Sequence, residues 1–348
     1  MRAGPNERSA TSCTSPAYPT GQVTGRPRIV PGVTAVGWGY DRPAGPLVPC
    51  EDVKAAGRME LYPAIQDRIP PMTSSDTIAA ALSPEGKLIG RVAFVTGGTR
   101  GIGAAIAQSL ARQGATIAAG YGGNLARAEA FAEEFRSKHV DDGVKITLHQ
   151  GNIASGDDCR RVVGEVIEQH GRLDILVNNA GITSDATIPK MTDDSWNKVL
   201  SVNLSGVFYL SQAALEHMLA RGTGRIINVS SVIGEMGSIG QANYAASKSG
   251  LFGLTKAFAR EAMFHLGRSG KLSGNRVSIT VNTVTPGYVA TEMLEEVPEK
   301  VLEKIRSQIP MGRVAEPEEV ARVVHFLAAD AAGYITGQVW GVNGGLDM

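Results

Sequence analysis

The sequence predicts one α/β domain built around a doubly wound parallel sheet, with helices on both faces and a disordered N-terminal extension. From Gly90 onward, short runs rich in valine, isoleucine and alanine alternate with amphipathic helical stretches, a pattern typical of parallel sheets. A glycine-rich turn joins the first apolar run to the first helix. The polar residues of interest stand where apolar runs end, which is the edge at which such sheets bind ligands.

Composition limits the classes of function that fit the chain. Its 348 residues carry a formal net charge of zero, so bulk electrostatics indicate no nucleic-acid partner. The cysteines Cys13, Cys50 and Cys159 lack metal-ligand spacing, and we expect neither a disulfide framework nor a metal site. No run of 18 apolar residues and no apolar core of a secretory signal occur, so we expect a cytoplasmic protein that does not enter a membrane.

The first 87 residues differ from the remainder. Twelve of the 17 prolines lie before residue 88, and stretches such as GRPRIVPGV cannot bury enough apolar surface to fold. Three interpretations stay open: a disordered tail, a true translation start at Met59 or Met72, and a transit peptide, since the first 40 residues are rich in arginine but little amphipathic. Residues 88–348, about 260 residues, are ample for one α/β domain with a large core.

The first strand, RVAFVTG, runs from Arg91 into the turn TGGTRGIG and the helix AAIAQSLARQG. Strand, glycine-rich turn and helix in this order predict a Rossmann-type dinucleotide site, although the spacing is Gly-x-x-x-Gly-x-Gly. Glycines let the backbone turn tightly and approach a pyrophosphate at the helix N-terminus. The predicted cofactor contacts of this turn are Gly97, Thr99, Arg100, Gly101, Ile102 and Gly103.

The second strand, ATIAAGYGG, indicates which dinucleotide binds. Sites that prefer NAD usually end this strand with a carboxylate for the ribose 2′-hydroxyl. Residues 120–124, including Tyr121, contain no carboxylate, whereas Arg100 and Arg127 offer cations for a 2′-phosphate. The sequence therefore favours NADP.

The third and fourth strands add further cofactor positions. VKITLHQGNI ends at Asn152 and Ile153, which we expect to face the adenine. LDILVNNAG ends in Asn179, Ala180 and Gly181, and small or amide side chains there suit close passage of a cofactor. Helices are predicted at 125–139 and 157–170, after the second and third strands.

A long helical stretch at 193–220 contains Asn203 in its middle. Asparagine is unfavourable inside a helix, and hosting a local kink or a water would explain it.

The fifth strand, GRIINVSS, delivers Ser231 at its carboxyl end, and a helix from about Gln241 to His265 follows. Tyr244 and Lys248 lie one turn apart on one face of that helix. We expect the ammonium to lower the tyrosine pKa by about three units, before desolvation offsets part of this shift, and so to bring it near the pH at which general acid–base catalysis works best. Ser231 would hold the substrate oxygen, so the trio predicts proton transfer to or from an alcohol oxygen.

The remainder completes the sheet. A polar insertion is predicted at 266–275, then a strand (VSITVNTVTPG), a lid-like segment from Pro286 to about residue 309, a helix (PEEVARVVHFLAAD) and a last strand (GQVWGVNGG). The insertion places Arg268, Lys271 and Arg276 within nine residues. They form either a solvated loop or a binding site for phosphates or for an acidic partner.

Taken together, TGGTRGIG, NNAG, Asn203, Ser231, YAASK and the PG at 286–287 make residues 88–348 resemble the short-chain dehydrogenase/reductase family. The resemblance implies a homotetramer and a catalytic tetrad. Tyr244 would donate the proton, Lys248 would lower its pKa and hold the nicotinamide ribose, Ser231 would polarise the carbonyl and Asn203 would keep a relay water. It implies further cofactor contacts at Tyr244, Lys248, Pro286, Gly287, Val289 and Thr291.

Within the family, the strings GQANYAASKSGL, YITGQ and VNGGLDM are most similar to 3-oxoacyl-carrier-protein reductases and acetoacetyl-CoA reductases. The implied reaction is NADPH-dependent reduction of a 3-oxoacyl thioester of CoA or acyl carrier protein. Two departures stand out: Gly222 occupies the place of an arginine that grips the carrier, with Arg221 one position off, and the insertion replaces a short turn. Alternatives are a reductase of polyketides, steroids or sugars, and a non-catalytic NADP-binding protein.

Overall fold

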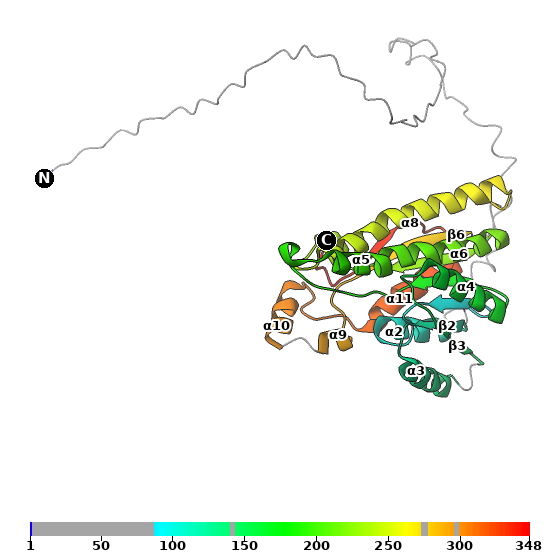
Figure 1. Cartoon of the computed structure of the whole chain (residues 1–348), viewed down its shortest axis with the longest axis horizontal. Helices are drawn as coiled ribbons and strands as arrows, with labels where there is room; N and C mark the ends of the chain where they lie inside the picture. The colour runs from blue at the N-terminus through cyan, green and yellow to red at the C-terminus, as the bar shows by residue number, and fades with distance from the viewer. Residues whose placement is uncertain (2–86, 140–142, 273–277, 296–298) are drawn as a thin grey trace, which may run out of the picture. The chain divides into compact units, whose positions relative to one another are not determined.

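The structure, a computed structural model, describes residue 1 and residues 87–139, 143–272, 278–295 and 299–348 (Figure 1). The predicted N-terminal extension, apart from residue 1 and Lys87, and the predicted cation Arg276 lie outside the described residues. Both stay predictions.

Seven parallel strands form one sheet in the order β3-β2-β1-β4-β5-β6-β7. All seven strands predicted from the sequence are present, so the predicted fold class is confirmed. The chain builds outward from β1 to β3, returns to β4 and then builds in the opposite direction, so the order reverses between β1 and β4. Ligands bind at such a switch point, outside the carboxyl ends of the strands. The strands are β1 (Val92–Val95), β2 (Thr116–Tyr121), β3 (Ile146–Gln150), β4 (Ile175–Asn178), β5 (Gly224–Val229), β6 (Ile279–Pro286) and β7 (Val339–Val342).

Helices cover both faces of the sheet because its strands carry apolar side chains on both faces. In β1, Ala93 and Val95 enter one apolar core, whereas Val92 and Phe94 enter the other. The first core packs against α2 (Gly101–Ala111), α3 (Leu125–Lys138) and α11 (Pro317–Ala328). The second packs against α4 (Gly156–His170), α6 (Gly206–Arg221) and α8 (Ala242–Arg268), which lie together in Figure 1. The shorter elements are η2 (Ile188–Lys190), α5 (Asp193–Leu200), η3 (Ser201–Ser205), α7 (Ile233–Met236), α9 (Glu292–Glu295), α10 (Glu299–Gln308) and η4 (Asp330–Ala332).

Two helices differ from their predicted bounds. The stretch predicted as one helix at 193–220 divides into α5, a π-helical turn at η3 and α6, so the helix is irregular at Asn203. Helix α8 continues to Arg268 instead of ending near His265. The predicted insertion at 266–275 therefore begins in helix, because Leu266 is fully buried in the second core and holds the last turn against the sheet.

Candidate active site

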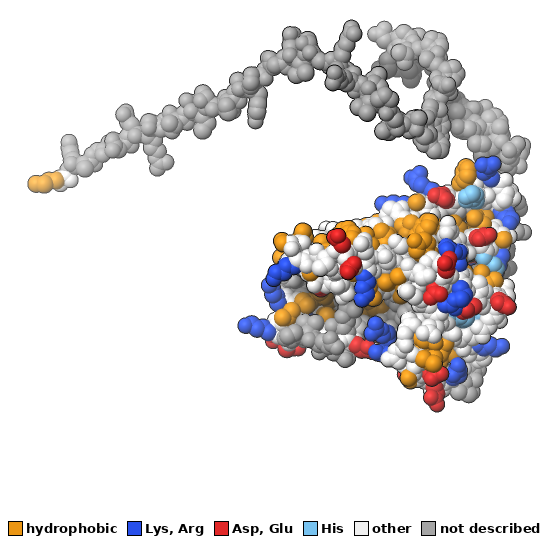
Figure 2. Space-filling view, viewed as in Figure 1, with side chains coloured by type: hydrophobic (Ala, Val, Ile, Leu, Met, Phe, Trp, Pro, Cys, Tyr) orange, Lys and Arg blue, Asp and Glu red, His pale blue; other side chains and the backbone are white. Residues whose placement is uncertain are grey.

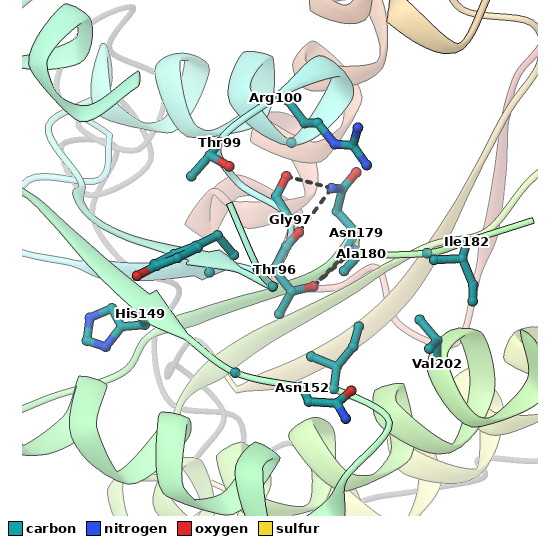
Figure 3. Close-up of a pocket in the computed structure, with 18 of the residues that line it drawn as sticks. Thr96, Gly97, Thr99, Arg100, His149, Asn152, Asn179, Ala180, Ile182 and Val202 are labelled. Atoms are coloured by element: carbon teal, nitrogen blue, oxygen red, sulfur yellow. Dashed lines mark hydrogen bonds between the residues drawn. The ribbon is translucent and has the colours of Figure 1, made fainter. Parts of the chain in front are cut away.

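A cavity of about 670 Å³ opens at the carboxyl ends of β1 to β4, at the switch point of the sheet (Figure 3). Most of the predicted cofactor residues line it: Gly97, Thr99, Arg100, Gly101, Ile102, Gly103, Tyr121, Asn152, Ile153, Asn179, Ala180, Gly181 and Thr291. The others, Tyr244, Lys248, Pro286, Gly287 and Val289, do not line this cavity and come from α8 and from the end of β6 and the residues after it. Their contacts with a cofactor stay predictions.

The glycine turn after β1 is tied to the end of β4. Asn179 Nδ2 donates to the Thr96 carbonyl at 3.0 Å and to the Gly97 carbonyl at 3.3 Å (Figure 3). Thr96 Oγ1 in turn accepts from the backbone N–H groups of Asn179 and Ala180. These bonds join two segments more than 80 residues apart, and they fix the shape of the cavity floor.

Two of the glycines are required by space. Gly97 has a φ of +61°, and a Cβ there would lie 3.2 Å from both Asn179 Nδ2 and Ala180 Cα. A Cβ on Gly103, at the start of α2, would lie 2.1 Å from the Gly97 carbonyl oxygen. The turn is therefore a cradle in which bare backbone faces the cavity beside a helix N-terminus. Such a cradle fits the pyrophosphate of a dinucleotide.

The end of β2 bears on the choice of dinucleotide. The cavity wall there consists of Gly120, Tyr121, Gly122, Gly123 and Asn124, without a carboxylate. Arg100 and Arg127 line the cavity from the N-terminal ends of α2 and α3. Among the described residues that line the cavity, Asp158 and Glu292 are the acidic ones, and the sequence reasoning missed both. Glu292 is 165 residues from its partner Arg127, so no local pattern reveals it.

Asp158 supports the predicted adenine end of the cavity. Its Oδ2 accepts from the Asn152 backbone N–H at 2.8 Å, and this bond, with others from Arg161, holds the pKa of Asp158 below its usual value. His149, also missed from the sequence, lies buried in the cavity wall on β3 and bonds to Thr147 Oγ1 at 2.9 Å. Burial lowers the pKa of His149, so the imidazole is predominantly neutral at pH 7.

Asn203 acts through the π-helical turn. The Gly206 N–H donates to the Ser201 carbonyl five residues earlier, as in a π-helix. Asn203 lies within this wide turn, and its side chain is buried in the domain. Its fully buried amide grips one backbone unit from both ends: Oδ1 accepts from the Ile182 N–H and Nδ2 donates to the Ile182 carbonyl, each at 2.9 Å. The side chain thus holds the segment after β4 in place.

The predicted trio comes together at the carboxyl end of β5. Lys248 Nζ lies 5.7 Å from the centre of the Tyr244 ring, and Ser231 hydrogen-bonds with Tyr244. Lys248 also lies beside Asn203, because a Cβ on Gly181 would be 3.4 Å from Nζ and 3.3 Å from Asn203 Oδ1. All four residues of the predicted tetrad therefore surround one point next to the cavity.

The predicted direction of the Tyr244 pKa shift is wrong. Burial raises the pKa of the Tyr244 phenol, and the hydrogen bond with Ser231 lowers it only in part. Lys248 directs its ammonium at the Val229 carbonyl, 2.8 Å away, and burial lowers the pKa of Lys248 to about 8. The sequence estimate counted the attraction between charges and gave too little weight to desolvation of both groups. Tyr244 is consequently a neutral phenol at pH 7 with a proton to give.

The cations of the predicted insertion have other partners. Lys271 Nζ donates to the Leu219 and Ala220 carbonyls, at 2.9 and 2.8 Å, and so caps the C-terminal end of α6. Arg268 stacks 5.5 Å from the centre of the Phe264 ring. The 24 residues of helix between Tyr244 and Arg268 correspond to about 36 Å. Arg268 and Lys271 thus lie far along α8 from Tyr244, and their binding of CoA phosphates or of a carrier protein stays a prediction.

The fold and this site define an oxidoreductase of the dinucleotide-binding α/β class, with a phenol and an ammonium beside a glycine-lined cavity. Residues 97–347 match the family model described as Enoyl-(Acyl carrier protein) reductase, and the chain belongs to the short-chain dehydrogenase/reductase family. In the part of the chain that the structure describes, no helix is long and apolar enough to cross a membrane. The same residues contain no group of three or more side chains that would hold a metal ion.

Curated relatives narrow the comparison. The chain is 48% identical to an acetoacetyl-CoA reductase of Rhizobium meliloti over 256 residues, which cover 73% of this chain and 98% of the relative. It is 45% identical to an acetoacetyl-CoA reductase of Shinella zoogloeoides with the same coverage. It is 43% identical to a 3-oxoacyl-[acyl-carrier-protein] reductase of Staphylococcus aureus, over 74% of this chain and 98% of the relative. About a quarter of this chain thus has no counterpart in these relatives.

Proposed function

We propose that the chain reduces a 3-oxoacyl thioester to the 3-hydroxyacyl thioester with NADPH. The observation that carries the proposal is that buried Ser231 and Lys248 lie with half-buried Tyr244 beside a glycine-lined cavity. The names of the relatives support the substrate class, since acetoacetyl-CoA and 3-oxoacyl-carrier-protein reductases both act on 3-oxoacyl thioesters.

The residues of the cavity fit NADP. The cradle of Gly97 and Gly103 would hold the pyrophosphate, and Arg100 and Arg127 would hold the 2′-phosphate. When bound, the nicotinamide supplies a hydride to the carbonyl carbon. The predicted contacts at Pro286, Gly287 and Val289 belong to this proposal.

The protein supplies the proton and stabilises the developing charge. As the carbonyl carbon gains hydride, its oxygen becomes basic and takes the Tyr244 proton, while Ser231 donates a hydrogen bond to the same oxygen. Lys248, with a pKa of about 8, is still largely protonated at pH 7 and stabilises the phenolate that remains. Asn203 fixes the segment that carries Gly181 beside Lys248, so the ammonium and the cavity keep their spacing.

The structure favours CoA over a carrier protein as the thioester. Arg221, one position from the place of the expected carrier-binding arginine, forms an ion pair with buried Asp174 at 3.0 Å. Gly222 ends α6 in a left-handed conformation and offers no cation. The charge with which the related carrier-protein reductases grip their partner is therefore engaged elsewhere in this chain.

The test is steady-state kinetics with acetoacetyl-CoA and a 3-oxoacyl carrier-protein thioester side by side, each with NADPH and with NADH. We expect turnover of both thioesters, a higher kcat/KM for the CoA form, and a preference for NADPH. Crotonyl-CoA serves as the control, because an enoyl thioester has no oxygen on its reacting carbon to receive the Tyr244 proton. Activity on crotonyl-CoA alone, or on neither thioester, would contradict the proposal.

We further assign the activity to residues 88–348 and expect a cytoplasmic homotetramer. The near-complete coverage of the relatives supports the first assignment, and deletion of residues 1–84 is expected to leave kcat and the melting temperature unchanged. Exposed aromatic side chains on α5, α6 and α8, among them Trp196, Phe208 and Phe264, support association of chains. Figure 2 shows hydrophobic side chains gathered on one face of the domain. Light scattering coupled to gel filtration measures the mass.

A further inference from the structure

Glu292 places a carboxylate between the two arginines at the mouth of the cavity. It forms an ion pair with Arg127, and its Oε2 lies 4.0 Å from Arg100 Nη1. All three side chains line the cavity and are 40–63% exposed. No other described acidic residue pairs with either arginine.

The space between Arg100 and Arg127 is an anion-binding site. Arg100 precedes the first turn of α2 and Arg127 lies in the first turn of α3, so two helix N-termini add positive potential to the two guanidinium groups. The wall behind them, from Gly120 to Gly123, contains no carboxylate. In this structure the anion in that site is the carboxylate of Glu292.

The place of Glu292 is set by its neighbour. A Cβ on Gly101 would lie 3.4 Å from Thr291 Cγ2, so Thr291 packs against the glycine turn. This contact brings the following residue to the arginines, although Glu292 comes 165 residues after Arg127 in the sequence. The carboxylate in the anion-binding site thus comes from the segment after β6 and not from the end of β2.

We propose that Glu292 is a specificity-determining residue whose carboxylate competes with the 2′-phosphate of the cofactor for Arg127 and Arg100. The proposal rests on the proposed use of NADPH. A phosphate that binds the arginines displaces the carboxylate or remains beside a like charge, and either event offsets part of its attraction. The 2′-hydroxyl of NADH is uncharged and meets no such competition, so Glu292 limits the preference for NADPH.

The experiment compares dissociation constants of NADPH and NADH for the wild type and the Glu292→Gln variant, measured by calorimetry or protein fluorescence without substrate. Because the pairs are exposed, we expect Glu292→Gln to tighten NADPH about two- to fivefold and to leave NADH unchanged. The gain should shrink in 0.5 M salt, which screens exposed charges. In an Arg127→Ala background the same substitution should have little effect.

Glu299→Gln is the matched control. Glu299 lies on the same segment and pairs with Arg306 at 2.5 Å, away from the cavity, so its replacement changes the net charge equally. An unchanged or weakened NADPH affinity in Glu292→Gln would overturn the proposal, as would an equal change in Glu299→Gln or for NADH. Failure of the proposed cofactor use is separate, because it would appear in the wild type as equal affinity for NADPH and NADH.

Discussion

At the scale of single residues, Tyr244 decides whether the site is catalytic. Desolvation raises the pKa of its phenol, so Tyr244 is neutral at pH 7 even though a hydrogen bond with Ser231 lowers that pKa in part. Tyr244→Phe keeps the ring and removes the proton, so we expect kcat to fall by at least about 10²-fold, the usual contribution of a general acid. NADPH affinity should persist, and turnover near the wild-type rate in this variant would remove Tyr244 from the mechanism.

The buried ammonium of Lys248 is expected to lower the free energy of unfolding of the domain. Its pKa is lowered from 10.5 to about 8 by burial. Below pH 8 both the folded and the unfolded chain carry the proton, so the cost of burying the charge is fully present. Between pH 8 and 10.5 the unfolded chain binds more protons, and stability rises with pH. Above 10.5 both forms are neutral and the cost is gone.

Lys248→Met should therefore raise the free energy of unfolding at pH 7, by about 1–2 kcal/mol after loss of the bond to the Val229 carbonyl. Activity should be abolished, and the gain in stability should decline between pH 8 and 10. Denaturant unfolding at several pH values measures both effects. The exposed Lys256 of the same helix is the control, and Lys256→Met is expected to change neither. A Lys248→Met variant less stable than the wild type at every pH would contradict this assignment.

At the scale of elements, the sequence predicted the strands but not the contacts that hold the elements together. The apolar runs and the glycine turn were sufficient to predict all seven strands. Parallel strands are buried on both faces, so they stand out in the sequence as continuous apolar runs. Asn203 indicated a local kink or a water site, since asparagine is unfavourable inside a helix, and the structure has a π-helical turn there. Its partner Ile182 lies 21 residues earlier, so the grip on that backbone unit was not visible in any local pattern.

The same limit applies to charges in loops and on helix ends. Arg268 and Lys271 resembled a phosphate-binding patch because sequence spacing does not tell which carbonyls lie nearby. The structure places Lys271 on the C-terminal carbonyls of α6, where a cation also interacts favourably with the helix dipole. The length of α8, which only the burial of Leu266 reveals, separates these cations from Tyr244.

Lys271→Met follows as a prediction at this scale. It keeps the apolar stem but leaves two carbonyls to solvent, so we expect a loss of about 0.3–1 kcal/mol in stability. The KM for acetoacetyl-CoA should be unchanged, because the side chain caps a helix and binds no substrate. Thermal unfolding and steady-state kinetics on one preparation test both points. A rise in KM confined to the CoA thioester would restore the phosphate-binding interpretation, with the substrate held by another chain.

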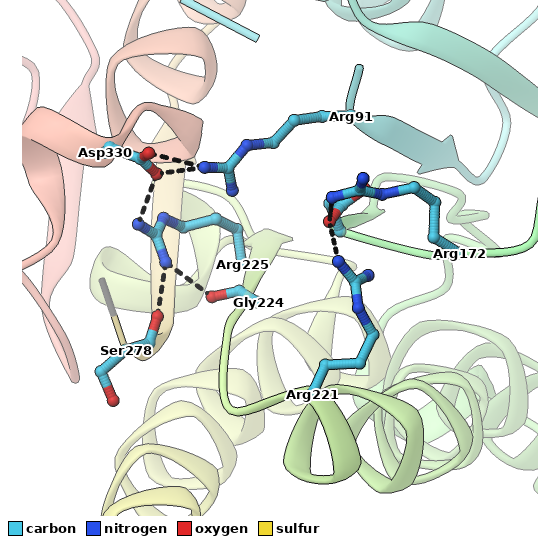
Figure 4. A network of polar contacts seen from close by, with 8 residues as sticks. Arg91, Arg172, Arg221, Gly224, Arg225, Ser278 and Asp330 are labelled. Atoms are coloured by element: carbon cyan, nitrogen blue, oxygen red, sulfur yellow. Dashed lines mark hydrogen bonds and ion pairs between the residues drawn. The ribbon is translucent and has the colours of Figure 1, made fainter. Parts of the chain in front are cut away.

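At the scale of the whole domain, function and stability occupy opposite edges of the sheet. The site lies at the carboxyl ends of the strands, whereas buried ion pairs gather at the amino ends (Figure 4). Arg225 is fully buried, bonds to the Gly224 and Ser278 carbonyls and reaches Asp330 at 3.2 Å. Asp330 also binds Arg91 at 2.6 Å. One carboxylate therefore pairs with two guanidinium groups, that of Arg91 directly before β1 and that of Arg225 in β5, and β4 lies between these two strands.

Asp174 is the second carboxylate at this edge. Burial opposes its charge, but bonds from Arg172 and the Val92 N–H, with the charge of Arg221, hold the pKa of Asp174 below its usual value of 3.8. Its contribution to stability is present above that value and is lost as the pH falls through the lower folded-state pKa. The ion pairs of Asp174 are thus expected to persist below pH 3.8, the usual pKa of a free aspartate.

Asp330→Asn tests the division between the two edges. Removing the carboxylate leaves Arg225 buried without a counter-charge, and breaking a buried pair from one side costs about 3–5 kcal/mol. Because Asp330 is 34% exposed, we expect the lower end of that range. At temperatures where the variant stays folded, kcat/KM should equal the wild-type value, since the ion pairs fix the ends of the strands that do not contact the cavity. Asp157→Asn, which breaks an exposed pair with Arg160, should cost less than about 1 kcal/mol. Equal costs in the two variants, or a folded Asp330→Asn protein with altered kcat/KM, would show that the two edges are coupled.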